Sequence, residues 1–225
     1  MQQMRIIITA ISNIFLCFSL TVIAQPSEGK RIALAFGDGP VPGVTELLLK
    51  QLDTLQIDAT FFLVGQEMER FPKQTRAIIN AGHQLGNHGY SHVSLANLPL
   101  SSAKAEIKKT CKLLQHHGYR ERPTILPPFG NISKELGNLL AEQKFQVAQW
   151  DLEPRRHVDM SKPEAIADYI VQNAKDGSVV MLHPMHEHGA EVVTALPLIS
   201  VQLKEQGFHF VRLAQIIDAD SNESL

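Results

Sequence analysis

Short apolar runs alternate along this chain with longer amphipathic stretches. The runs have the length and the β-branched and aromatic content of buried strands, and they lie at residues 31–36, 59–64, 84–85, 124–126, 145–150, 178–182 and 208–213. Helical spacing of apolar residues, with caps and glycine stops, marks residues 44–55, 72–81, 102–115, 133–143, 161–175 and 194–206. Alternation repeated about seven times predicts a mainly parallel sheet covered by helices, either doubly wound or closed into a barrel. The acidic residues after Ile217 predict a loose tail.

The N-terminal segment has a different pattern from the rest. Arg5 precedes an almost wholly apolar run over residues 6–24, whose end suits cleavage by signal peptidase. We therefore expect residues 1–24 to be a signal peptide and residues 25–225 to form one domain. An uncleaved membrane anchor is the alternative for a run of this length, but its two central polar residues favour cleavage. The protein is then exported, to a periplasm or to the extracellular space.

Composition narrows the class of partner. The 21 basic and 23 acidic residues of the chain form no basic stripe for nucleic acid or acidic lipid, so we expect neither partner for the mature chain. A neutral partner such as a glycan fits this balance. After signal cleavage Cys111 is the single cysteine left in the sequence, so packing rather than an intrachain disulfide must stabilise the fold.

Side chains able to bind a metal follow three of the predicted strands. Asp38 follows the first strand, His88 and His92 follow the third, and His183 follows the sixth. Loops at the carboxyl ends of parallel strands meet on one side of the fold. Two histidines four residues apart can also point to the same side of one helical turn. Two imidazoles and a carboxylate that leave positions open can hold a divalent metal together with water and substrate.

Several longer segments resemble those of one enzyme family. Residues 36–40 (Phe-Gly-Asp-Gly-Pro) resemble its Phe-Asp-Asp-Gly-Pro motif, and residues 126–130 (Leu-Pro-Pro-Phe-Gly) resemble its Arg-Pro-Pro-Tyr-Gly element. The remaining matches are residues 59–65, 81–92, 150–157 and 182–183. Over nearly the whole mature chain, the sequence is similar to polysaccharide deacetylases with a NodB-homology domain, which form carbohydrate esterase family 4.

The resemblance implies a fold, a reaction and a set of site residues. The fold is a distorted (β/α) barrel of about seven parallel strands, and the reaction is metal-dependent removal of N- or O-acetyl groups from a cell-wall or exopolysaccharide glycan. By this resemblance Asp38, His88 and His92 bind the metal, most often zinc, and His183 is the catalytic acid. Substrate-binding positions are Phe129, Gly130, Trp150 and Leu182. Phe129 and Trp150 are suited to stack on a sugar ring, and Leu182 to line an acetyl pocket, although all three also suit core packing.

Three positions depart from the family pattern. The aspartate expected as general base is Gly37, the arginine that steadies it is Leu126, and the Asp-Trp pair that ends the fourth motif is Arg156-His157. General-base catalysis contributes roughly 10²–10⁴ in rate, so the sequence predicts an enzyme with reduced or altered base chemistry. Candidates to replace the base are His186, Glu187, His188, Glu153 and His157.

Two other functions suit the same residues. The departures at the base and its arginine are also expected of a catalytically silent relative that binds glycan or assists a partner. Two histidines and one aspartate are also the ligand set of iron(II) oxygenases, although the family resemblance points away from that chemistry.

Overall fold

The computed structural model describes residues 29–223, so the predicted signal peptide lies outside the described residues. Five strands form one parallel sheet: β1 (Lys30–Gly39), β2 (Thr60–Leu63), β3 (Gln84–Asn87), β4 (Ser178–Leu182) and β5 (Phe208–Phe210). The order is β3-β2-β1-β4, and β5 pairs with β1. The strand β1 is therefore central and has three strand partners.

β1 is longer than its apolar run predicts. Its residues 32–36 pair with β4, and residues 30–32 pair with β5. Pairing with β2 continues past Phe36 to Gly39, after an irregularity in register. The glycine-rich segment thus bends the strand instead of ending it, and carries Asp38 to the carboxyl edge of the sheet.

The predicted strands at 124–126 and 145–150 are reduced to single bridges. Ile125 bridges Asn87 and Val147, and Leu152 bridges Val180 of β4, all in parallel. Prolines at 123, 127 and 128 lack amide donors and prevent a longer ladder around Ile125. The bridges nevertheless extend the parallel pairing from β3 to Val147 and from β4 to Leu152, an arrangement that agrees with the distorted parallel α/β barrel that the sequence predicts.

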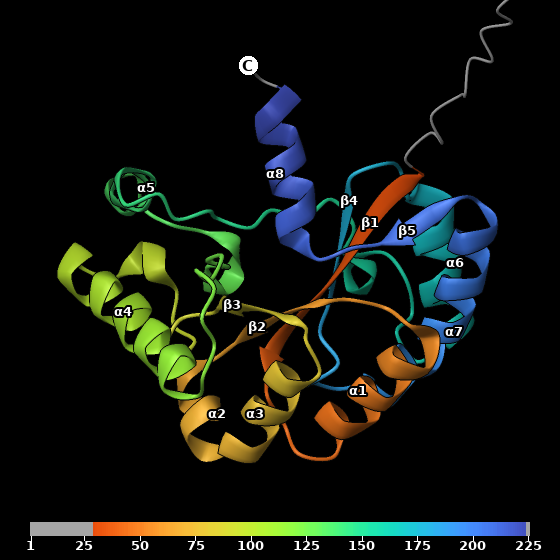
Figure 1. Cartoon of the computed structure of the whole chain (residues 1–225), viewed down its shortest axis with the longest axis horizontal. Helices are drawn as coiled ribbons and strands as arrows, with labels where there is room; N and C mark the ends of the chain where they lie inside the picture. Colours follow the sequence, from red (N-terminus) through yellow and green to blue (C-terminus); the bar gives the residue numbers. More distant parts are fainter. Residues whose placement is uncertain (1–28, 224–225) are drawn as a thin grey trace, which may run out of the picture.

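Eight α-helices lie in the described residues. They are α1 (Val44–Leu55), α2 (Gly65–Arg70), α3 (Pro72–Asn80), α4 (Leu100–His116), α5 (Lys134–Glu142), α6 (Pro163–Asn173), α7 (Gly189–Glu205) and α8 (Leu213–Glu223). In Figure 1, α1, α2 and α3 lie along one side of the sheet, α6 and α7 at one end, and α4 and α5 at the other. None of these helices combines the length and the apolar character needed to span a bilayer.

The sequence predicts six of the eight helices in the described residues and misses α2 and α8. The helix α2 has only six residues, too few to show a helical periodicity in the sequence. The prediction of a loose tail after Ile217 is wrong, because the helix α8 continues to Glu223. The predicted capping box at residues 161–164 does not form either. Lys162 caps α6 without a side-chain bond, because the Ser161 hydroxyl donates instead to Asp159.

Alternate residues of β1 face two different apolar clusters. Ile32, Leu34 and Phe36 pack against α1, α6 and α7 in the largest cluster. Ala33 and Ala35 point the other way, into a smaller cluster with Phe62. Both clusters end at the carboxyl edge of the sheet, where the candidate site lies.

Candidate metal centre

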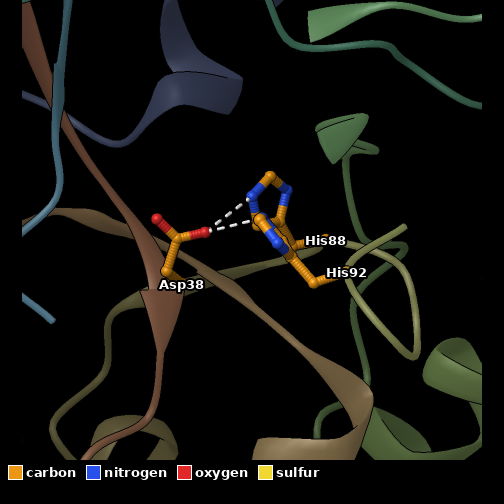
Figure 2. Close-up of side chains that lie close together, drawn as sticks. All are labelled: Asp38, His88 and His92. Atoms are coloured by element: carbon orange, nitrogen blue, oxygen red, sulfur yellow. Dashed lines mark hydrogen bonds and ion pairs between the residues drawn. The ribbon is translucent and has the colours of Figure 1, made fainter. Parts of the chain in front are cut away.

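Asp38 occupies a constrained position on β1. Its φ of 69° lies in the left-handed region, which aspartate tolerates better than most residues. The next residue is fixed to β2, because the amide of Val64 donates to the carbonyl of Gly39 at 2.9 Å. Only 9% of the Asp38 side chain is exposed. The backbone therefore directs a nearly buried carboxylate toward the loop that follows β3 (Figure 2).

His88 and His92 lie in an irregular loop, so the prediction that they share a helical turn is wrong. Gly89 and His92 have φ values of 74° and 56°, which are incompatible with a continuous right-handed helix. The loop is held through its backbone instead. The amides of Gly65 and Gln66 at the start of α2 donate to the carbonyls of Gly89 and Tyr90, at 3.0 and 2.8 Å. The two rings still converge, with centroids 4.9 Å apart.

Two polar side chains from neighbouring elements complete this support. The Glu106 carboxylate of α4 accepts hydrogen bonds from the amides of Tyr90 and Ser91, at 2.9 and 2.7 Å. Asn87 is fully buried. Its side-chain Nδ2 donates to the carbonyl of Ile107, and its side-chain Oδ1 accepts from the backbone amide of Gly89. The loop conformation is thus set by buried hydrogen bonds, which are costly to break.

The three side chains meet with the spacing of metal ligands. Asp38 Oδ1 lies 3.1 Å from His88 Nε2 and 2.9 Å from His92 Nε2 (Figure 2). All three ligand atoms lie within 4.8 Å of one another. Ligands bound at about 2.0–2.2 Å to one ion stand roughly 2.8–3.6 Å apart in tetrahedral or octahedral geometry. The Asp38, His88 and His92 set therefore fits a single divalent metal ion.

The tautomer of His88 supports the same conclusion. Its Nδ1 donates to the carbonyl of Leu126 at 2.7 Å, the support that metal-binding histidines usually have. In a ring protonated only at Nδ1, Nε2 presents a lone pair to the Asp38 carboxylate, and a cation between the two would satisfy both groups. Protons on both rings would place two cations around one carboxylate oxygen, whereas one metal ion satisfies all three ligands.

Two further histidines approach the other oxygen of Asp38. His186 Nε2 lies 2.9 Å from Oδ2, and His183 Nε2 lies 3.8 Å from it. Burial would raise the pKa of Asp38, but contacts with His88 and His92 outweigh burial and hold it well below its usual value. Burial lowers the pKa of His183 to about 4, with Asp38 opposing the shift and Arg155 adding to it. His183 is therefore neutral at pH 7.

A cavity of about 250 Å³ opens beside the three ligands. Four residues that the sequence analysis singles out line it: Phe129, Gly130, Trp150 and His183. Phe129 is 65% exposed and its ring centroid lies 5.2 Å from that of His92. Gly130 has a φ of 79°, and a Cβ there would lie 3.1 Å from the Trp150 ring, so only glycine fits this turn without strain.

Leu182 does not line this cavity. It is 1% exposed in the largest apolar cluster, and it borders a smaller adjoining cavity of about 190 Å³. Its neighbour Met181 lines the main cavity instead. Successive residues of a strand point to opposite faces, so Met181 faces the main cavity and Leu182 faces the apolar cluster on the other side of β4.

Of the side chains considered as replacements for the base, only His186 contacts the metal ligands. Glu187 and His188 border the adjoining cavity. His157 stacks on Tyr169 at 4.8 Å, and the Glu153 carboxylate is held by Trp150, Arg155 and Arg156. Among the positions that depart from the family pattern, Leu126 packs in the smaller apolar cluster.

Gly37 leaves space for the His183 ring. A Cβ at this position would lie 3.2 Å from His183 Cδ2 and 3.4 Å from Nε2. An aspartate at position 37 would therefore crowd the imidazole. Arg155 and Arg156 also line the cavity; Arg155 was not singled out from the sequence, where a pair of arginines after a proline looks like an ordinary solvated turn.

A parallel α/β fold with two histidines and an aspartate gathered at the carboxyl edge of its strands indicates the class of metal-binding proteins. Comparison with known proteins identifies the family within that class. The family model for polysaccharide deacetylase matches residues 24–148, more than half of the chain. This chain belongs to the polysaccharide deacetylase family.

Individual relatives agree with this assignment. The chain is 33% identical over 203 residues to the peptidoglycan-N-acetylmuramic acid deacetylase PdaC of Bacillus subtilis, covering 87% of this chain and 42% of that protein. It is 34% identical over 191 residues to a peptidoglycan-N-acetylglucosamine deacetylase of Bacillus cereus, covering 84% and 68%. The crystal structure of the Bc1960 peptidoglycan N-acetylglucosamine deacetylase superposes with a TM-score of 0.78 at 33% identity, covering 85% of this chain and 89% of that one.

Proposed function

We propose that this protein is a metal-dependent hydrolase that removes acetyl groups from a glycan. The observation that carries the proposal is the convergence of Asp38, His88 and His92 beside His183 in one cavity. Family membership and relatives named as deacetylases support it, and they favour an enzyme over a silent glycan-binding relative. An oxygenase has no comparable support.

The chain's own residues have separable tasks in this reaction. A divalent metal held by Asp38, His88 and His92 would supply Lewis-acid activation of water and of the acetyl carbonyl. His183 Nε2 is neutral, so it can take up a proton from the attacking water and return it to the departing amine or alcohol. With glycine at position 37, we propose that this one imidazole performs both proton transfers.

The other lining residues hold the sugar. Phe129 offers an exposed ring beside His92, and aromatic rings of this kind stack on the apolar faces of sugars. Leu126 and Met181 form an apolar wall that excludes water from the reacting group. The cavity of about 250 Å³ is below the roughly 300–1,000 Å³ of pockets that enclose a drug-sized ligand. It therefore accommodates one part of a glycan chain.

We further propose zinc as the metal, peptidoglycan or a related cell-wall glycan as the substrate, and export through residues 1–24 as the route to it. The ligand set of two imidazoles and a carboxylate suits zinc. The relatives are named for action on peptidoglycan.

The test is acetate release from N-acetylglucosamine oligomers and from peptidoglycan, with the protein loaded in turn with zinc, cobalt and nickel. We expect release with at least one metal, and its loss in His92→Ala together with loss of tight metal binding. His116→Ala, an exposed histidine of α4, is the matched control and should keep both properties. Glycan binding without acetate release under every metal would contradict the proposal.

A further inference from the structure

The cavity beside the metal ligands has an unusually cationic wall. Of the side chains that line it, Arg155 and Arg156 are cationic, and Asp38, already surrounded by histidines, is the acidic one. The chain as a whole carries a formal net charge of −2, so the positive wall does not follow from overall composition. A bound divalent metal would make the site more positive still.

The side chains of both arginines are held in place by an ion pair with Glu153. They are consecutive residues of a 3₁₀ turn at Pro154–Arg156, where adjacent side chains should point about 120° apart. Both nevertheless return to Glu153: Arg155 Nε lies 2.6 Å from Oε1, and Arg156 Nε lies 2.5 Å from Oε2. The Glu153 side chain is 4% exposed, and the indole of Trp150 also donates to it.

This arrangement leaves binding capacity on both guanidinium groups. Each one contacts Glu153 through Nε, and within residues 29–223 neither has a hydrogen bond from its terminal Nη atoms. The side chains are 47% and 62% exposed. One buried carboxylate cannot neutralise two arginines, so a positive charge with free planar donors remains at the edge of the cavity. A carboxylate matches such planar donors in both geometry and charge.

We infer that Arg155 and Arg156 select a glycan in which a sugar carries a free carboxylate next to the acetylated sugar. The inference rests on the proposed deacetylase function and names its substrate class. The carboxylate could belong to a uronic acid or to a lactyl ether. In either case the aromatic side of the cavity would hold the sugar ring. The arginines would bind the carboxylate and so determine which sugar of the glycan lies beside the metal ligands.

The experiment compares two ligands that differ only in charge. One is an oligosaccharide that alternates N-acetylglucosamine with glucuronate. The other is the same oligosaccharide after carboxyl reduction, which makes each glucuronate a neutral glucose and keeps every acetyl group. An oligosaccharide carrying a lactyl carboxylate, from N-acetylmuramic acid, forms a third arm that separates the two carboxylate sources. Calorimetry is performed on zinc-loaded His183→Ala protein, in which turnover is blocked.

We expect the glucuronate or the lactyl ligand to bind about tenfold more tightly than the neutral one at low salt, the size of one or two partly exposed charged hydrogen bonds. Added salt should reduce this preference. Arg155→Gln and Arg156→Gln should each remove most of it and leave binding of the neutral oligosaccharide unchanged. Each single variant keeps the other arginine and Trp150 as partners for Glu153, and thermal unfolding checks its fold.

Arg76→Gln, on an exposed position of α3, makes the same charge change away from the cavity and should preserve the preference. Equal affinity for charged and neutral ligands would overturn the inference while leaving the deacetylase proposal intact. So would arginine variants that weaken both ligands alike. Failure of any glycan to bind the zinc-loaded protein would overturn both proposals together.

Discussion

The segments that carry Asp38, His88 and His92 are held through their backbone, by amides at the end of β2 and the start of α2 and by the Glu106 carboxylate of α4. The substrate-facing side of the site, in contrast, is formed by side chains of two short turns. Phe129 and the arginine pair are 47% to 65% exposed, but the side chains of Asp38 and His88 are 9% and 4% exposed. The candidate metal ligands are thus supported by the buried interior of the fold, whereas the side chains proposed to face the glycan lie on its surface. Substitutions should have very different effects on the two.

The largest effect is expected from Asn87→Ala, on the metal-binding side. The change leaves the amide of Gly89 and the carbonyl of Ile107 buried without their partner. We expect a loss of about 2–3 kcal/mol in the free energy of unfolding and weaker zinc binding, measured by urea denaturation and chelator competition. Asn80→Ala, at the exposed end of α3, should change neither. An Asn87 variant of native stability would mean that the loop does not depend on this side chain.

An intermediate effect is expected from His186→Ala, at the boundary between the two sides. His186 contacts the Asp38 oxygen that His88 and His92 leave free, so it orients the carboxylate without belonging to the close ligand set. Outer contacts of this kind contribute about 10–100-fold to metal affinity, and the exposed position of His186 puts the expected loss near tenfold. Zinc affinity by chelator competition measures it, and His188→Ala is the neighbouring control. Unchanged affinity would exclude a positioning role.

The smallest effect is expected from Gly37→Asp, which restores the residue type that the family pattern has at this position. The new side chain meets the His183 ring at 3.2 Å, and Leu126 cannot orient a carboxylate. We expect acetate release to change by less than about threefold, in contrast to the 10²–10⁴ that a competent base contributes. Gly37→Ala controls for crowding. A large gain from the aspartate alone would show that His183 does not perform both proton transfers.

The sequence allowed much of this architecture to be predicted where local pattern and tertiary structure agree. The helix at 44–55 and the strand at 178–182 were predicted with their observed bounds, because each has strong periodicity and clear end signals. Strands around Ile125 and Val147 were overestimated, since apolar content does not reveal that flanking prolines remove the ladder hydrogen bonds. The convergence of Asp38, His88 and His92 was predicted from strand order and the family motifs, although the loop that carries the two histidines is not helical.

The arginine wall shows where such prediction ends. Nothing local distinguishes Arg155 and Arg156 from a solvated pair, because their alignment depends on a carboxylate that tertiary packing buries. His186 is among the base candidates that the sequence offers, but its contact with Asp38, 148 residues away in sequence, could not be predicted. Side chains brought together by the closing of the sheet leave no periodic signal in the chain.

The hydrogen bond from His88 to the carbonyl of Leu126 has a thermodynamic consequence. Leu126 begins the segment that carries Phe129, and the Phe129 ring also contacts the ring of His92. His92 thus contacts Phe129 directly, and His88 is connected to it through the backbone of the same segment. Occupancy of one site restricts the other, and linkage requires the effect to be reciprocal. Whatever factor a bound metal ion contributes to glycan affinity, bound glycan must contribute the same factor to the affinity for that metal.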